Sequence, residues 1–209
     1  MIIGAAGQQG SQQGNIARQS LLRAGLPVSV AGMSLDRQCA SGMMAIATAA
    51  KEITEDGMTI TVGGGVESVS LVRNENFRMD RARDPWLEEN IPALYMTMIE
   101  TAENVAKRYG ISREAQDEYS LQSQMRTARA QQNGYMDKEI VPLKSTMKYK
   151  DKETGEISSH DVCIEKDEGN RPSTTFEGLS ALKPVFKDGI YLKEGEYITA
   201  VSYTHLTLP

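Results

Sequence analysis

The sequence predicts an α/β fold, in which a parallel strand–helix–strand layer is followed by a charged and mostly helical second part. Three observations predict it. Short apolar strands alternate with helical patterns over residues 1–65, an order typical of parallel βαβ units. The composition becomes strongly charged after Leu71. Capping residues and closing glycines then mark two further helices between residues 98 and 134.

Composition excludes several classes of protein. The chain has 209 residues, 40% of them hydrophobic, which is enough for a sizeable core. A net charge of −5 without a basic cluster argues against nucleic acid or a membrane surface as a partner. No apolar run reaches membrane-spanning length, and the first residues carry no secretory signal pattern. We therefore expect a cytoplasmic protein.

Metal ligands are scarce. His160 and Cys163 form the only close pair of metal-binding residue types, whereas a zinc site needs three or four ligands. The sequence therefore predicts no metal centre. Cys39 and Cys163 are the two cysteines, and we expect a reducing compartment in which they do not pair.

The first elements are short. Residues 1–4 read as a strand, Asn15 can cap the following helix, and residues 25–27 end it. Glycines and glutamines fill residues 5–14, but their spacing is not that of a phosphate-binding loop. We expect a flexible connection there.

Residues 34–47 read as a short strand, a tight turn and a helix that begins at Cys39. Apolar residues on one face of this helix are expected to be buried, namely Met43, Ile46, Ala50 and Ile53. Alanines on the opposite face let a second element approach, namely Ala45, Ala47 and Ala49. The helix should therefore be central.

A second strand is expected over residues 58–62, with Gly63–Gly65 at its end. Active groups collect at the carboxyl ends of parallel strands, so Cys39 and the three glycines should lie near one edge of the sheet. We expect the glycines to allow close backbone packing there.

The second part begins with an irregular charged stretch over residues 73–90. A helix is expected from Met98 to Tyr109, ended by Gly110, and a longer one from Ser112 to about Asn133. Residues 144–169 predict a hairpin or an extended loop. The loop at residues 171–175 combines Arg171 with several hydroxyls, a set that can bind a phosphate group.

Cys39 is the candidate nucleophile. The first turn of a helix has unpaired N–H groups and partial positive charge, and both favour the thiolate form of a cysteine. Small residues beside it, Ala40 to Gly42, leave room for a substrate. The alternative is a buried structural cysteine without chemistry.

Seven stretches, spread over residues 1–200, together resemble thiolases, the family of acetyl-CoA acetyltransferases and 3-ketoacyl-CoA thiolases. They lie in the family's order at residues 14–19, 38–42, 64–70, 101–106, 112–117, 138–142 and 182–186. The resemblance implies that Cys39 accepts an acyl group from acyl-CoA as a thioester, with no bound cofactor. It also implies contacts to coenzyme A from Met98, Arg171 and Phe186.

The chain departs from the family pattern at Ile99, where glycine is usual, and at Gly178, where a serine commonly contacts CoA. The resemblance implies a partial N-terminal thiolase domain over residues 1–70 and an inserted CoA-binding loop domain over 71–189. A return strand is expected over 190–200, and residues 201–209 read as a foreign tail. The family's opening strand and helix and its second half, with a Gly-His-Pro histidine and a second cysteine, have no counterpart here. We therefore expect a fragment that is inactive in condensation, from a parent that is a homo-oligomer.

Two other functions stay open. A β-ketoacyl synthase also places a cysteine at a helix start, although its cysteine is usually followed by serines and it lacks the inserted domain. A non-catalytic CoA-binding or lipid-carrier protein on the same scaffold would need no activated Cys39. Acyl chain length and the direction of the reaction are likewise open.

Overall fold

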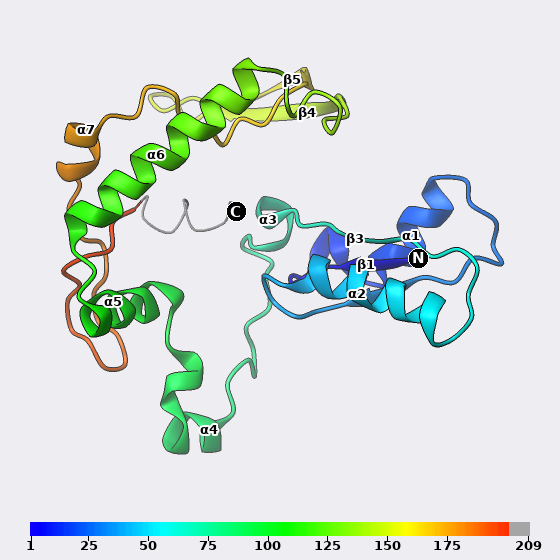
Figure 1. Ribbon diagram of the computed structural model, residues 1–209, viewed down its shortest axis with the longest axis horizontal. Coiled ribbons are helices and arrows are strands. Elements are labelled where there is room, and N and C mark those ends of the chain that lie inside the picture. Colours follow the sequence, from blue (N-terminus) through cyan, green and yellow to red (C-terminus); the bar gives the residue numbers. More distant parts are fainter. Residues whose placement is uncertain (201–209) are drawn as a thin grey trace. The chain divides into compact units, whose positions relative to one another are not determined.

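The computed structural model describes residues 1–200 and divides into two compact units, residues 1–82 and the residues from 83 on (Figure 1). The first unit holds a three-stranded parallel sheet with strand order β2-β1-β3. Its strands are β1 (Ile2–Gly4), β2 (Met33–Leu35) and β3 (Gly63–Gly65), and its main helices are α1 (Ile16–Arg23) and α2 (Ser41–Thr54). This is the α/β class that the sequence predicts.

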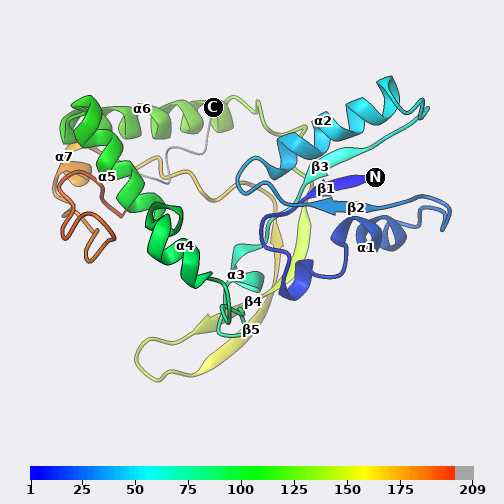
Figure 2. The ribbon, with the colours of Figure 1, turned by 90° about the horizontal axis from the view of Figure 1, so that it is seen from below.

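The two helices of the first unit cover opposite faces of the sheet (Figure 2). The chain runs from β1 to β2 through α1 and returns past β1 to β3 through α2. The two crossovers run in opposite directions along the sheet and have the same handedness, so their helices lie on opposite faces. As predicted, Asn15 caps α1, because its side chain accepts a hydrogen bond from the N–H of Arg18 at 3.1 Å. A 3-10 turn (Gly10–Gln12) and α3 (Val69–Val72) complete the unit.

Helix α2 packs against the sheet through its small residues. Ala45 and Ala49 are buried against Ile2 of β1. The expected apolar face was wrong, since Met43 is 76% exposed and Ile46 is 58% exposed. The reason is close backbone packing: a Cβ atom at Gly63 would lie 2.8 Å from the Cα atom of Ile46, so larger side chains cannot lie between α2 and β3.

The third strand lies later in the chain than expected. The glycines Gly63–Gly65 form β3 themselves and pair with β1, whereas residues 58–62 are not a strand and Ile60 is 85% exposed. The segment still meets the sheet at its last residue, because the N–H of Ile2 donates to the carbonyl of Val62 at 2.7 Å. Because β3 pairs with β1 directly beneath α2, its residues must be glycine and cannot be the β-branched residues that are common in other strands.

The second unit is mainly helical and contains one hairpin. Its helices are α4 (Pro85–Asn90), α5 (Met98–Tyr109), α6 (Arg113–Gln132) and α7 (Phe176–Ser180), with a 3-10 turn at Pro92–Tyr95. The antiparallel strands β4 (Leu143–Lys150) and β5 (Ile157–Ile164) form the hairpin predicted for residues 144–169. Helix α4 interrupts the stretch that was expected to be irregular, and Asp84 caps it by accepting from the N–H of Leu87.

Local capping signals set the ends of α5 and α6, as predicted. The side chain of Ser112 accepts from the N–H of Ala115 at 3.1 Å, and Thr97 caps α5 in the same way. Gly110 and Gly134 take positive φ angles of 63° and 68° after the two helices.

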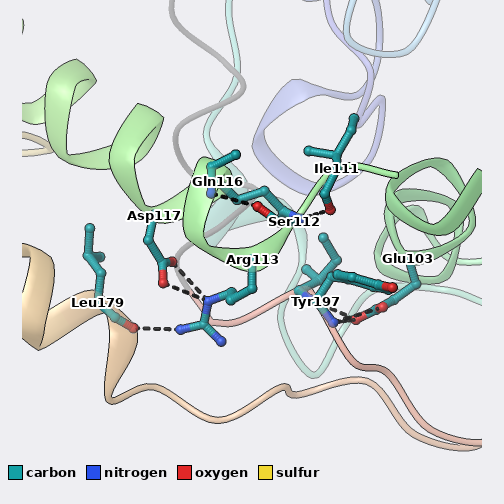
Figure 3. A network of polar contacts seen from close by, with 10 residues as sticks. Glu103, Ile111, Ser112, Arg113, Gln116, Asp117, Leu179 and Tyr197 are labelled. Atoms are coloured by element: carbon teal, nitrogen blue, oxygen red, sulfur yellow. Dashed lines mark hydrogen bonds and ion pairs between the residues drawn. The ribbon is translucent and has the colours of Figure 1, made fainter. Parts of the chain in front are cut away.

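Two buried glutamates of α5 hold the segment at residues 190–198. Glu100 is 1% exposed and accepts from the N–H groups of Ile190, Tyr191 and Leu192 at 2.6–3.0 Å. Glu103 is 2% exposed and does the same for the N–H groups of residues 196–198; its bond to Tyr197 is drawn in Figure 3. A return strand was expected over residues 190–200, but these residues contain only isolated bridges, such as the one between Pro184 and Thr199. Two carboxylates therefore accept the hydrogen bonds from backbone N–H groups that a neighbouring strand would otherwise accept.

Arg113 forms an ion pair within α6 and a hydrogen bond from α6 to α7. The Nε atom of Arg113 donates to both carboxylate oxygens of Asp117 at 2.8 and 2.9 Å, and its NH2 group donates to the carbonyl of Leu179 at 2.6 Å (Figure 3). The Asp117 side chain is only 4% exposed. The hydrogen bond to Leu179 thus fixes the end of α7 against α6.

Candidate active site

Cys39 lies in a sharp turn between β2 and α2. Its neighbour Gln38 has a φ angle of +51°, and Ala40, the N-cap of α2, has φ −93° and ψ 9°. The Ser41 hydroxyl holds the turn closed, because it donates to the carbonyl of Gln38 at 2.6 Å and accepts from the N–H of Arg37 at 2.9 Å. A backbone held in these conformations fixes the direction of the cysteine between them.

The turn leaves backbone donors free beside the sulfur atom. Among residues 1–200, the N–H groups of Cys39, Gly42 and Met43 have no hydrogen-bond partner. Cys39 itself is exposed, and Cys163 on β5 is exposed and free as well. The helix thus begins at Ser41, two residues later than expected, and Cys39 directly precedes its N-cap in an exposed and not a buried position.

An open cavity of about 420 Å³ surrounds Cys39. It lies at the carboxyl edge of the sheet, and Gly65 from β3 lines it, which confirms the predicted meeting of the cysteine with the glycine segment. Half of its lining residues are small, namely Gly4, Ala6, Gly7, Ser41, Gly42 and Gly65. Val66, Val69, Glu67 and Arg73 also line it. The cavity can therefore admit an extended substrate up to the sulfur atom.

Glu67 lies in the same cavity wall, and sequence reasoning did not single it out. One carboxylate oxygen accepts from the N–H groups of Ala6 and Gly7 at 2.9 and 3.3 Å, and the other accepts from the side-chain amide of Gln12 at 2.7 Å. Partial burial raises the pKa of Glu67, but these bonds and the charge of Arg73 outweigh it and leave the pKa below its ordinary value. Glu67 is therefore a carboxylate held by three N–H donors.

The second unit contains a separate cavity of about 510 Å³ around the loop at residues 171–175. Arg171, Ser173 and Thr174 line it together with Gly178. The backbone N–H of Arg171 donates to the Oε1 atom of Gln124 at 2.7 Å, which fixes the start of the loop. Within residues 1–200 the Arg171 guanidinium has no ion-pair partner, so it is available to a ligand.

The other two residues expected to contact CoA differ from each other in exposure. Met98 is the first residue of α5 and is 74% exposed. Phe186 is 7% exposed and packs in the core of the second unit, where Cβ atoms at Gly189 and Gly195 would collide with it. The structure does not test the CoA contacts proposed for Met98, Arg171 and Phe186, and those roles stay predictions.

Two other kinds of feature are absent from residues 1–200, a metal centre and a membrane-spanning helix. Within residues 1–200, no group of three histidine, cysteine or acidic side chains is arranged to hold a metal ion. No helix in this part of the chain is long and apolar enough to cross a membrane. The foreign tail expected over residues 201–209 lies outside the described residues.

Comparison with known proteins identifies a family. Residues 1–197 match the family model of the thiolase N-terminal domain. Beta-ketoadipyl-CoA thiolase of Pseudomonas putida is 39% identical over 199 residues, which are 88% of this chain and 47% of that protein. Peroxisomal 3-ketoacyl-CoA thiolase A of Rattus norvegicus is 40% identical over 182 residues, 83% of this chain and 39% of that protein.

Solved structures give the same result. Human mitochondrial 3-ketoacyl-CoA thiolase superposes with a TM-score of 0.72 at 32% identity, over 95% of this chain and 49% of that one. The acetyl-CoA acetyltransferase of Bacillus anthracis gives a TM-score of 0.71 at 35% identity, over 95% and 48% of the two chains. A second structure of the human enzyme, solved in complex with CoA, gives 0.70. The chain thus spans about half the length of these relatives, and with its parallel sheet, its Cys39 turn and the family match over residues 1–197 it belongs to the thiolase family.

Proposed function

We propose that this chain carries the acyl-accepting site of an acetyl-CoA C-acetyltransferase or acetyl-CoA C-acyltransferase, with Cys39 as the nucleophile. The observation that carries the proposal is the Cys39 turn. It holds an exposed thiol next to unpaired N–H groups in an open cavity lined by small residues. A thiolate in such a place is a good nucleophile, and the free donors suit the negative oxygen that forms when it attacks a thioester.

The first step transfers an acyl group. The Cys39 sulfur attacks the carbonyl carbon of acyl-CoA, the new S–C bond forms, and the bond to the CoA sulfur breaks. The proton of the Cys39 thiol ends on the departing CoA thiol, and the acyl group stays on Cys39 as a thioester. A second acyl-CoA, deprotonated at its α-carbon, then attacks this thioester. The new C–C bond forms, the bond between the acyl carbon and the Cys39 sulfur breaks, and the proton lost from the α-carbon is balanced by the one that restores the Cys39 thiol. The product is a 3-ketoacyl-CoA, and the reverse reaction cleaves one. A covalent intermediate of this kind predicts ping-pong kinetics.

The cavity at residues 171–175 supports a site for the phosphate-bearing end of CoA. A free guanidinium at Arg171, beside the hydroxyls of Ser173 and Thr174, is a suitable set of donors for a phosphate. We assign Met98 and Phe186 to contacts with the pantetheine part of the substrate. No bound cofactor or metal enters this proposal, and CoA acts as a substrate.

The setting of the parent enzyme is also a proposal. We place it in the cytoplasm as a homo-oligomer, a dimer or a tetramer, although some relatives are named peroxisomal or mitochondrial. The relatives include beta-ketoadipyl-CoA thiolases and 3-ketoacyl-CoA thiolases, so the length of the acyl group is left to experiment.

The test is acylation of the chain by acetyl-CoA and by longer acyl-CoAs, followed by mass spectrometry of the intact protein and its peptides. One acyl group on the peptide that contains Cys39 is expected in the wild type and in Cys163→Ser, and none in Cys39→Ser. Arg171→Ala should raise the acyl-CoA concentration for half-maximal acylation and leave the limiting rate unchanged. Tight binding of acyl-CoA without an adduct on Cys39 would refute the proposal and favour a carrier protein.

A further inference from the structure

We infer that Glu67 and Gln12 act together as positioning residues for the wall of the Cys39 cavity, by fixing the backbone at Ala6 and Gly7. This inference rests on the proposed function for its link to acyl transfer, but the contacts that carry it are independent of that function. Gln12 is only 3% exposed and does not line the cavity, so it reaches Cys39 through other residues.

The two side chains link the carboxyl ends of two strands. Residues 5–12 follow β1, and residues 66–68 follow β3. Glu67 binds the N–H groups of Ala6 and Gly7, while Gln12 donates to the carbonyl of Gly7 at 2.8 Å and accepts from the N–H of Ser68. The two side chains also bind each other at 2.7 Å. The wall is therefore held by one connected network and not by separate contacts.

The third strand end joins the same network through the backbone. The N–H of Ala5 donates to the carbonyl of Leu35 in β2 at 2.9 Å, and the N–H of Val66 donates to the carbonyl of Gly4 at 3.0 Å. The strand β2 leads directly into the Cys39 turn. A shift of the backbone at Ala6 and Gly7 would thus change the position of this wall relative to Cys39.

The chemistry of Glu67 matters because a carboxylate only accepts hydrogen bonds. Its two oxygens face three N–H donors, and a glutamine in its place would turn an NH₂ group toward at least one of them. Glu67 is accessible to solvent, so water can replace the lost bonds. Water does not fix the loop in one place, however, and a misplacement of about 1 Å in an active site can lower a rate by about 100-fold.

The backbone at Gly7 is packed too closely to accept a side chain. A Cβ atom at Gly7 would lie 2.8 Å from the side chain of Val72 and 3.0 Å from Glu67. The glycine is therefore needed where the loop passes between Glu67 and α3.

The experiment compares wild type, Glu67→Gln, Gln12→Met and the double variant in the full chain, with Glu118→Gln as the control. Glu118 is an exposed carboxylate of α6 in the other unit and does not line this cavity. The first measurement is the rate of acylation of Cys39 by acetyl-CoA. The second is the rate of its alkylation by iodoacetamide, divided by the rate at Cys163 in the same sample.

We expect acylation to fall by about tenfold or more in each single variant, because the wall is misplaced. The acylation rate of the double variant should lie within about twofold of the rate of the slower single variant, because the two residues form one network. Alkylation relative to Cys163 should rise in Glu67→Gln, because a loosened wall gives the reagent readier access to the Cys39 sulfur. Far-UV circular dichroism of each variant shows whether it is folded and so separates positioning from unfolding, and Glu118→Gln should change neither rate.

Three results would overturn the inference: wild-type rates in both single variants, losses that multiply in the double variant, or the same changes in Glu118→Gln. If acyl-CoA does not acylate the wild type, the proposed function fails. The alkylation ratio then decides the positioning role by itself, and an unchanged ratio in Glu67→Gln refutes it.

Discussion

Replacing Glu100 with glutamine tests whether a buried carboxylate holds the segment at residues 190–192. One carboxylate oxygen accepts from Tyr191 and Leu192 at 2.6 and 3.0 Å, and the other accepts from Ile190 at 2.9 Å. A glutamine keeps one acceptor oxygen, so at least one N–H group faces an NH₂ group in a place that is 1% exposed. A buried N–H donor without a partner costs about 1–3 kcal/mol. The hydrogen bonds that remain go to a neutral amide oxygen instead of a charged carboxylate and are therefore weaker.

We therefore expect Glu100→Gln to lower the free energy of unfolding by about 2–4 kcal/mol at neutral pH. The measurement is urea unfolding followed by circular dichroism. The control is Glu118→Gln, the same change at an exposed position of α6, which should have an effect within about 0.5 kcal/mol.

The effect should depend on pH. Burial raises the pKa of Glu100, but the three backbone N–H groups outweigh it and leave the pKa below its ordinary value. The folded-state pKa is thus lower than the unfolded one. The carboxylate stabilises the fold fully above the unfolded value of about 4.3, and this stabilisation is lost as the pH falls through the folded value.

The difference between wild type and Glu100→Gln should therefore narrow when the pH falls below about 4. Amide hydrogen exchange at Ile190, Tyr191 and Leu192 should also be faster in the variant at neutral pH. The reasoning is refuted if the two proteins unfold at the same urea concentration at neutral pH, or if their difference is constant with pH.

Two further changes test the packing of each unit by urea unfolding. Gly63→Ala would place a Cβ atom 2.8 Å from the backbone of α2 and should cost about 3 kcal/mol, whereas Gly64→Ala, with its nearest atom at 3.9 Å, should cost less than about 1 kcal/mol. Equal losses at the two glycines would contradict the account of the α2 interface. Arg113→Ala leaves the buried Asp117 carboxylate unpaired and should cost about 3 kcal/mol, while Arg78→Ala breaks an exposed pair and should cost less than about 1 kcal/mol. A small effect at Arg113 would show that water replaces its guanidinium.

The ends of α5 and α6 could be predicted from the sequence because their signals are local. Ser112 binds an N–H group three residues away, and Gly110 supplies a left-handed residue directly after its helix. Cys39 could be placed for the same reason, since a turn followed by a helix is a pattern of a few residues. These interactions do not depend on how distant parts of the chain pack.

The buried face of α2 could not be predicted in this way. Periodicity predicts which residues share a face, and hydrophobicity then favours Met43 and Ile46 for the interior. The choice is decided by β3, where Gly63 brings the backbone so close that only Ala45 and Ala49 fit. Close backbone contact thus outweighed side-chain hydrophobicity.

The polar network around Cys39 lay beyond sequence reasoning for a different reason. Glu67 and Gln12 lie 55 residues apart, and Gln12 is one of four glutamines between residues 8 and 13. Nothing in the chain near either residue indicates the other as its partner. Only the parallel pairing of β1 with β3 brings the segments that carry them together.

The two glutamates of α5 also set an order for folding. Their partners follow them by 90–95 residues, so α5 is synthesised well before the segment that covers its carboxylates. Until residue 198 is available, water must solvate Glu100 and Glu103, and the helix face that carries them has no partner. Closing such a long loop is slow compared with forming a helix, so the second unit should complete its core late. A nascent chain that has passed α6 but not yet reached residue 190 should accordingly expose α5 to proteases, and this exposure should end when the last ten described residues have been added.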